Sequence, residues 1–212
     1  FAVSPVAAVV TTVSRNGMMR VWDMVTGACG KSWKGAHRLP VACAAYEKSG
    51  TLVVTGGTDK GVMVWDVVHG HATHAFRGHA APVTVVAFAP SAHMVERLVS
   101  GAEDGEIRVW DLIASAPLAS LKEHFSAVMC LAFSPDVAGY TLVSGGRDRI
   151  LCVWDMRDAA AASGASTATT VAARLTVPAL ESVEGVVMLP APAGAAAAGV
   201  ARAMMFVTAG DG

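Results

Sequence analysis

Neither sign of charge dominates this chain. Its 212 residues include 16 Lys and Arg and 17 Asp and Glu, which gives a formal net charge of −1. A protein that neutralises phosphates needs clustered Lys and Arg. The composition therefore leaves no electrostatic footprint for nucleic acid or for an anionic membrane.

Cysteine is scarce, and its spacing forms no CxxC motif or other pair. Three of the four cysteines lie within strand-like stretches, so we expect reduced, buried thiols and an intracellular compartment rather than disulfides. The four positions are Cys29, Cys43, Cys130 and Cys152.

Long apolar runs and helical patterning are also missing. No uninterrupted apolar stretch is long enough to span a bilayer. Residues 1–13 are apolar, but they carry no basic segment and merge into the repeat described below, so we expect no secretory signal peptide. No segment keeps an apolar period of 3.6 residues, so we expect helix to be scarce.

Motifs for catalysis and metal binding are absent too. The glycines around Lys60 lack the spacing of a phosphate-binding loop. His69, His71 and His74 cluster, but no Cys or carboxylate at ligand spacing accompanies them. A solvated turn leading into an outer strand is the preferred interpretation, and a metal site is the alternative. We expect no enzyme, no cofactor and no resident metal.

The chain does contain a repeat. Trp-Asp pairs begin at Trp22, Trp65, Trp110 and Trp154, at intervals of 43, 45 and 44 residues. A period of this length suits four short strands. Because such a unit cannot bury its apolar face alone, it must stack on its neighbours.

Three further features keep register with the Trp. A turn residue lies six positions before it, a hydroxyl residue lies four positions before the turn residue, and three units have a His 28 to 31 residues before the Trp. The turn residues are Asn16, Asp59, Asp104 and Asp148. The hydroxyl residues and histidines are Thr12, Thr55, Ser100, Ser144, His37, His79 and His124.

Short runs of strand-forming residues occupy matching places in each unit. Asx residues suit the turns between them, and Asn16-Gly17 is a strong hairpin signal. The expected strands are 73–76, 83–88, 98–101, 107–111, 117–121, 128–133, 142–145 and 150–155.

These residues resemble the WD-repeat family over nearly the whole chain. The resemblance implies an all-β fold, a β-propeller whose blades are four-stranded antiparallel sheets around a central channel. Residues 1–212 would supply about five blade equivalents, with the fifth truncated at 212 and both ends incomplete. We expect an excerpt of a larger propeller protein, with low-complexity surface loops at 158–173 and 191–201 that carry no chemistry.

The resemblance also implies a hydrogen-bonded network of His, hydroxyl residue, Asp and Trp inside each blade. The first repeat keeps Thr12 and Trp22, but it has Asn16 in place of Asp and lacks the His. The three full sets are His37, Thr55, Asp59 and Trp65; His79, Ser100, Asp104 and Trp110; and His124, Ser144, Asp148 and Trp154.

A partner-binding surface is implied on the narrow face, where the loops before the first strand and between the second and third strands meet. One Phe and three Arg there fit the residue types enriched at protein interfaces. The alternative for each residue is a solvated loop position without a partner. The candidates are Arg15, Arg38, Thr58, Glu103, Phe125 and Arg147.

A closer resemblance is to the first propeller of the transducin-beta-like 3 family. Phe76-Arg-Gly-His79, residues 126–134 and residues 144–149 are similar to it. The most specific stretch is Val177-Pro-Ala-Leu-Glu-Ser-Val-Glu184, which leads to Met188-Leu-Pro190 and puts Ala179 where other repeats have the His.

That resemblance implies a nucleolar scaffold, a UTP-B component of the small-subunit processome that assembles and processes the 18S ribosomal RNA precursor. Its partners would be protein subunits, with precursor or small nucleolar RNA contacted indirectly and no membrane or small-molecule substrate. The alternative is a generic WD-repeat adaptor, such as a ubiquitin-ligase substrate receptor or a signalling scaffold. A propeller enzyme is a distant third.

Overall fold

The repeat folds into antiparallel sheets, each built from strands that follow one another in the chain. The computed structural model describes residues 1–35, 37–90, 97–134, 140–157, 169–189 and 204–209. Blade 1 has the order β1 (Ala2–Val3), β2 (Val9–Val13), β3 (Met18–Asp23) and β4 (Cys29–Lys34). Blade 2 consists of β5 (Val41–Tyr46), β6 (Leu52–Gly57), β7 (Gly61–Asp66) and β8 (His71–Arg77).

The remaining sheets repeat this order with small departures. Blade 3 consists of β9 (Val83–Phe88), β10 (Arg97–Ala102), β11 (Ile107–Asp111) and β12 (Ala116–Leu121). Blade 4 consists of β13 (Val128–Phe133), β14 (Thr141–Gly146), β15 (Ile150–Asp155) and β17 (Ala173–Pro178). Blade 5 contributes β18 (Val183–Leu189) and β19 (Met204–Ala209).

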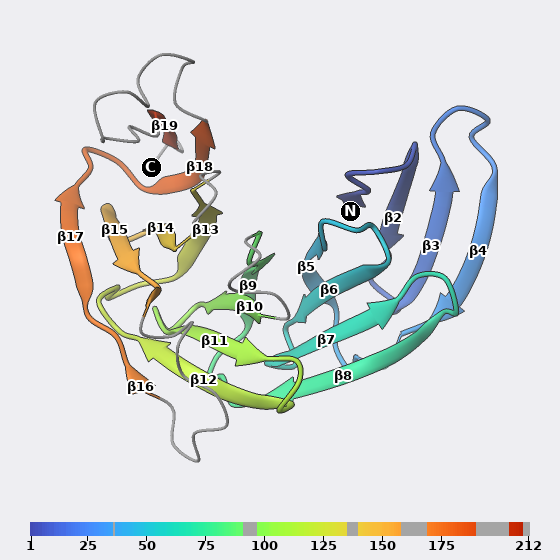
Figure 1. Cartoon of the computed structure of the whole chain (residues 1–212), viewed down its shortest axis with the longest axis horizontal. Helices are drawn as coiled ribbons and strands as arrows, with labels where there is room; N and C mark the ends of the chain where they lie inside the picture. Colours follow the sequence, from blue (N-terminus) through green and yellow to red (C-terminus); the bar gives the residue numbers. More distant parts are fainter. Residues whose placement is uncertain (36, 91–96, 135–139, 158–168, 190–203, 210–212) are drawn as a thin grey trace.

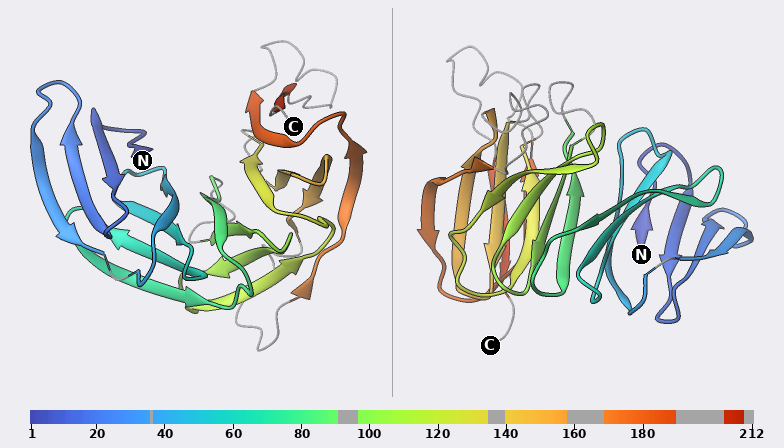
Figure 2. Two further views of the ribbon diagram at one scale, coloured as in Figure 1. Left: turned by 180° about the vertical axis from the view of Figure 1, so that it is seen from behind. Right: turned by 90° about the horizontal axis from the view of Figure 1, so that it is seen from below.

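The blades stand side by side along an open arc (Figure 1). The first strands of the blades line the inner side of the arc, and the outer strands β4, β8, β12 and β17 line its outer side. In the view from below, the strands of successive blades run alongside one another (Figure 2, right). The architecture is that of a β-propeller whose described blades form an open arc.

The expected strands are confirmed. Those at 83–88, 107–111, 128–133 and 150–155 coincide with β9, β11, β13 and β15. The other four differ from the observed strands by one or two residues at an end. The expected loop at 158–173 contains β16 (Thr169–Thr170), a two-residue strand that pairs in parallel with β12. Residues 158–168 and 191–201 of the two expected loops lie outside the described ranges.

The Trp of each Trp-Asp pair follows an irregularity in the hydrogen-bonding ladder. The pairing between third and fourth strands shifts register immediately before Trp22, Trp65, Trp110 and Trp154. A bulge of this kind bends the strand and re-aims the side chain that follows it. The sequence repeat is therefore also a repeat of backbone geometry.

The hydrophobic core lies between adjacent blades. Successive side chains of a strand point to opposite faces. In β6 of blade 2, Val53 therefore packs toward blade 1, in a cluster with Met19, whereas Val54 packs toward blade 3, in a cluster with Trp110. Both faces of blades 2, 3 and 4 are covered in this way. The exposed fraction is 2% for Trp65, 1% for Trp110 and 0% for Trp154.

In blades 2, 3 and 4, a glycine follows the hydroxyl residue of the network and lets the blades approach closely. A Cβ added to Gly56 would lie 2.5 Å from Val83 Cγ1 of the next blade, and one added to Gly101 would lie 2.8 Å from Val128 Cγ1. Gly145 meets Val183 in the same way. Atoms this close would overlap, so each joint requires glycine opposite valine.

Candidate functional site

Blade 2 contains a chain of hydrogen bonds from the core to the surface. Trp65 Nε1–H donates to Thr55 Oγ1 over 2.8 Å, and Thr55 Oγ1 lies 2.8 Å from His37 Nε2. His37 Nδ1 lies 2.9 Å from Asp59 Oδ1. Since a carboxylate only accepts, Nδ1 carries a proton, and a neutral ring then accepts the Thr55 hydroxyl proton at Nε2.

Asp59 ties this chain to the loop at the surface. Its carboxylate accepts from the backbone N–H groups of Arg38 at 2.9 Å and Gly61 at 3.2 Å. Burial disfavours the charged carboxylate, but the hydrogen bonds from Arg38 and His37 outweigh it, so the pKa of Asp59 lies below its ordinary value. The network thus fixes the backbone at Arg38, whose side chain is exposed.

Blade 4 repeats this arrangement. Trp154 Nε1–H donates to Ser144 Oγ at 2.8 Å, and Ser144 Oγ lies 2.7 Å from His124 Nε2. His124 Nδ1 lies 2.8 Å from Asp148 Oδ2, which also accepts from the Phe125 N–H at 3.0 Å. The structure therefore brings together all four expected members in blades 2 and 4.

Blade 3 departs from the expected network. Trp110 Nε1–H donates to Ser100 Oγ at 2.8 Å, and His79 Nε2 lies 2.7 Å from the same hydroxyl. His79 Nδ1 has no hydrogen-bond partner among the described residues, and Asp104 accepts instead from the Glu106 N–H at 3.1 Å. The expectation that Asp104 bonds to His79 is therefore wrong.

Blade 3 differs from blades 2 and 4 in carrying an arginine beside the network, where those blades have Met63 and Cys152. The Arg108 guanidinium lies 5.9 Å from the Trp110 ring centroid, and its Nη1 atom occupies the space beside Gly78. Burial and, to a smaller extent, the positive charge of Arg108 together lower the pKa of His79 from 6.5 to about 4. At neutral pH His79 is uncharged and holds only the Ser100 end of the network.

Glu106 balances Arg108. Glu106 Oε2 lies 3.0 Å from Arg108 Nη2, and Oε1 accepts from the Ser120 hydroxyl at 2.6 Å. Lys122 Nζ lies 3.5 Å from Oε1. Burial opposes ionisation of Glu106, but Ser120 and Arg108 outweigh it, so the pKa of Glu106 lies below its ordinary value.

Blade 1 keeps only the hydroxyl end. Trp22 Nε1–H donates to Thr12 Oγ1 at 2.8 Å. Asn16 Oδ1 accepts from the Ser14 hydroxyl at 2.5 Å and from the Met18 N–H at 3.2 Å, so it organises its own turn. Asn16 therefore stabilises its own turn, whereas Asp59 and Asp148 bond to the loop that precedes the first strand of their blades.

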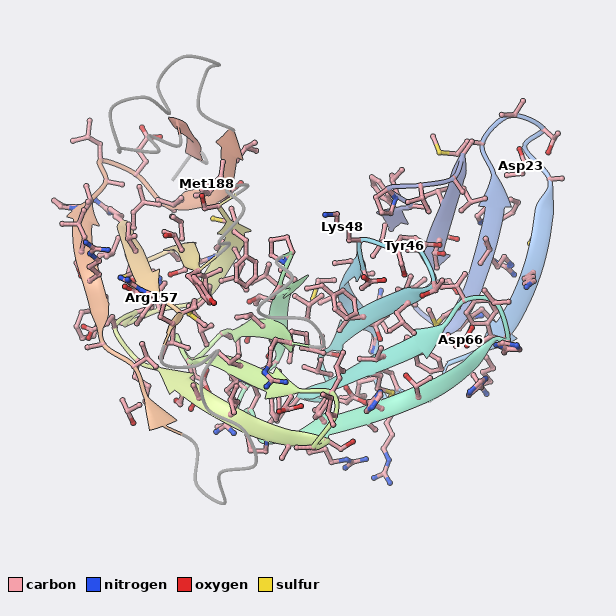
Figure 3. All side chains as sticks on the ribbon, viewed as in Figure 1. Asp23, Tyr46, Lys48, Asp66, Arg157 and Met188 are labelled. Atoms are coloured by element: carbon pink, nitrogen blue, oxygen red, sulfur yellow. The ribbon has the colours of Figure 1, made fainter. Side chains whose placement is uncertain are left out.

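The Asp of each Trp-Asp pair has a separate role at the opposite end of the strand. Figure 3 shows Asp23 and Asp66 at the ends of β3 and β7. Asp23 Oδ1 accepts from the Val25 N–H at 2.8 Å, and Asp66 Oδ1 accepts from the His69 N–H at 2.9 Å. Asp111 and Asp155 accept from the N–H groups that follow them. The carboxylates of Asp23, Asp66 and Asp111 close the turn into the fourth strand of their blades.

The rings of His69 and His71 lie 6.0 Å apart between centroids, whereas His74 has a different neighbour. His69 Nδ1 lies 2.8 Å from Asp66 Oδ2, a carboxylate contact that the sequence interpretation overlooked. The His74 ring stacks on Phe76 with a centroid distance of 5.9 Å. Across the described ranges, no group of three or more His, Cys, Asp or Glu residues is placed to hold a metal ion.

The candidate contact residues next to the turns share one backbone bond. The residue before the turn Asp donates its N–H to a loop carbonyl: Thr58 to Pro40 at 2.9 Å, Glu103 to Pro82 at 2.9 Å and Arg147 to Ala127 at 3.0 Å. Glu103, Arg147 and Arg15 are exposed. Thr58 is half-buried and its hydroxyl donates to Pro40 O at 3.0 Å, so this side chain is already engaged.

The sequence interpretation named Phe125 but missed two other surface residues, Leu180 and Arg149. Phe125 is 85% exposed and follows a loop His, and Leu180 is 95% exposed and follows Ala179, which stands at the His position of the next repeat. Arg149, directly after Asp148, is exposed as well. The alignment of Ala179 with the loop histidines was the signal that identifies Leu180 as the counterpart of Phe125.

No helix in the portion of the chain that the structure describes combines the length and apolar character needed to cross a membrane.

Comparison with known proteins gives consistent matches. The family model of the WD domain, G-beta repeat, matches residues 27–66, 70–111 and 115–155. The chain is 40% identical over 211 residues to transducin beta-like protein 3 of Bos taurus, covering 100% of this chain and 24% of that protein. The Homo sapiens protein of that name is 39% identical over 211 residues. U3 small nucleolar RNA-associated protein 13 of Saccharomyces cerevisiae is 32% identical over 85 residues, covering 40% of this chain and 10% of that protein.

The chain therefore spans about a quarter of the length of the mammalian relatives it matches, 24% in each case.

Proposed function

The chain belongs to the WD-repeat family, and from that premise we propose that it is a non-catalytic scaffold in ribosome biogenesis. Its place would be in the small-subunit processome, which assembles and processes the 18S ribosomal RNA precursor. The observation that carries this proposal is the 40% identity to transducin beta-like protein 3 along the whole chain. The printed name of the yeast relative, a U3 small nucleolar RNA-associated protein, supports it.

The geometry favours a scaffold because the polar residues of the repeat are engaged in holding the fold. In blades 2 and 4 the His and Asp side chains bond to each other and to the loop backbone. These bonds fix exposed loop residues such as Arg38 and Phe125 in place. Fixed loops lose little conformational freedom on binding, which favours association with a partner.

The partners in this proposal are other protein subunits of a UTP-B type complex, in the nucleolus. Precursor RNA or small nucleolar RNA would be reached through those subunits, because the net charge of −1 gives no general attraction for phosphates. Contact residues would come from Arg15, Arg38, Thr58, Glu103, Phe125 and Arg147, with Thr58 the weakest candidate because its hydroxyl is engaged.

The test is affinity purification of the full-length protein from cells at moderate salt, with mass spectrometry of the proteins and sequencing of the RNA that co-purify. We expect processome subunits and 18S precursor RNA. Depletion of the protein should also cause unprocessed 18S precursor to accumulate, measured by RNA blotting. Recovery of a ubiquitin-ligase or signalling complex, with normal precursor processing, would replace this proposal by the generic adaptor function.

A further inference from the structure

Two large apolar side chains are exposed on neighbouring loops, each of which precedes the first strand of a blade. Among the described residues, Leu180 at 95% and Phe125 at 85% are the most exposed large hydrophobic side chains. Phe125 lies in the loop that enters β13, and Leu180 lies in the loop that enters β18. Single exposed apolar residues are ordinary, so whether these two form a binding surface depends on the residues that lie between them.

The turn between β14 and β15 lies between these two loops and is bonded to both. On one side, the Arg147 N–H donates to Ala127 O at 3.0 Å and Asp148 accepts from the Phe125 N–H at 3.0 Å. On the other side, the Ala179 N–H donates to Arg149 O at 2.7 Å. The backbone thus holds Phe125, the turn and Leu180 in one continuous surface.

The turn presents two arginines on this surface. Asp148 is turned inward toward His124, and both of its neighbours, Arg147 and Arg149, are exposed. Arg149 adopts a positive φ of 62°, a conformation that its backbone bonds hold in place. Within the ranges that the structure describes, neither guanidinium forms an ion pair. We call Phe125, Arg147, Arg149 and Leu180 the Phe125–Leu180 patch.

We propose that the Phe125–Leu180 patch binds an extended, acidic segment of a partner protein that carries bulky apolar side chains. The apolar side chains would cover Phe125 and Leu180. Carboxylates between them would accept hydrogen bonds from the two guanidinium groups, which donate to carboxylates with bidentate geometry. This inference rests on the proposed scaffold function and gives the chemistry of one of its partners.

A protein segment fits the patch better than single-stranded RNA. Leucine offers no ring on which a base could stack, whereas RNA binding of this kind depends on aromatic platforms along a basic groove. Glu123 and Glu181 lie on the loops beside the patch, and Glu184 is the second residue of β18. They repel the evenly spaced phosphates of RNA, whereas a peptide has carboxylates only at selected positions.

The test uses the full-length protein and a short fluorescein-labelled peptide in which two glutamate residues lie between two leucine residues, with binding followed by fluorescence anisotropy. We expect the double substitution Phe125→Ala and Leu180→Ala to weaken binding by about tenfold, and Arg147→Glu with Arg149→Glu to weaken it by at least as much. Matched controls away from the patch, Ile113→Ala and Arg174→Glu, should keep the affinity within about twofold. Near-ultraviolet circular dichroism of each variant checks that it is folded.

Three results would overturn the inference: no peptide binding, equal binding by patch and control variants, or patch-dependent binding of an oligouridine probe in place of the peptide. The purification experiment is repeated with the patch variants to separate the two proposals. Patch-dependent peptide binding, with no processome subunits in the purification, would contradict the proposed function and support peptide binding by the patch. Processome recovery with no peptide binding would do the reverse.

Discussion

Trp154 donates its indole N–H to the Ser144 hydroxyl, ten residues earlier in the chain, over 2.8 Å. The same bond, with the same separation and length, joins Trp22 to Thr12, Trp65 to Thr55 and Trp110 to Ser100. It is the one part of the expected network that all four Trp residues share. Each hydroxyl therefore satisfies a buried or half-buried indole that would otherwise lack an acceptor.

Ser144→Ala should destabilise the fold by about 1–3 kcal/mol, because it leaves both Trp154 Nε1 and His124 Nε2 without a partner in the interior. Urea unfolding of the full-length protein and the variant measures the difference. Ser32→Ala on the exposed strand β4 is the control and should change the free energy of unfolding by less than about 0.5 kcal/mol. Equal effects of the two substitutions would contradict a structural role for the bond.

Gly101→Ala should destabilise the fold by about 1–3 kcal/mol, because the added Cβ would lie 2.8 Å from Val128 Cγ1. Combining it with Val128→Ala should cost less than the sum of the two single substitutions, since the second makes room for the first. Gly30→Ala, whose added Cβ would meet nothing closer than 3.9 Å, is the control. Thermal unfolding of the four variants checks this, and strict additivity would argue against a steric fit.

His79 should make stability depend on pH. Burial and Arg108 lower its pKa from 6.5 to about 4, so between these values the unfolded chain binds a proton that the folded chain does not. Stability therefore falls as pH decreases from 6.5 to 4, by an upper bound of about 3 kcal/mol for this group. Urea unfolding across this range should give a steeper decline for the parent protein than for His79→Gln. Parallel pH profiles would show that His79 is not responsible.

Glu106→Gln should destabilise the fold by about 1–3 kcal/mol, because the Arg108 guanidinium would lose its countercharge in a largely buried site. Glu103→Gln, an exposed residue on the same turn, should have an effect below about 0.5 kcal/mol. Urea unfolding of both variants at neutral pH is the measurement. A neutral result at Glu106 would mean that solvent compensates Arg108 fully.

The strands and the stacking of blades were predictable because the same pattern of residues occurs in several repeats. A period of 43 to 45 residues and short runs of strand-forming residues locate β9, β11, β13 and β15 to the residue. The spacing of His, hydroxyl residue, Asp and Trp was also sufficient to name the side chains that bond to one another in blades 2 and 4.

The departures come from side chains outside the repeating positions. Arg108 and Glu106 stand where blade 2 has Met63 and Gly61, and only the packed structure brings their charges to His79. Likewise, the need for glycine at 56, 101 and 145 arises from a valine in the next blade, which strand pattern alone does not place opposite it.

The glycine and valine that meet between blades also bear on how such a chain can lengthen. The same complementary pair forms the joints after blades 2, 3 and 4, so a tandem copy of one of these repeats would meet a neighbour already shaped to receive it. Blade 1 has Val13 at the glycine position and does not share this fit. Growth by duplication of whole repeats is therefore sterically permitted in the middle of the arc, whereas at the first joint it would first require a change of side chain.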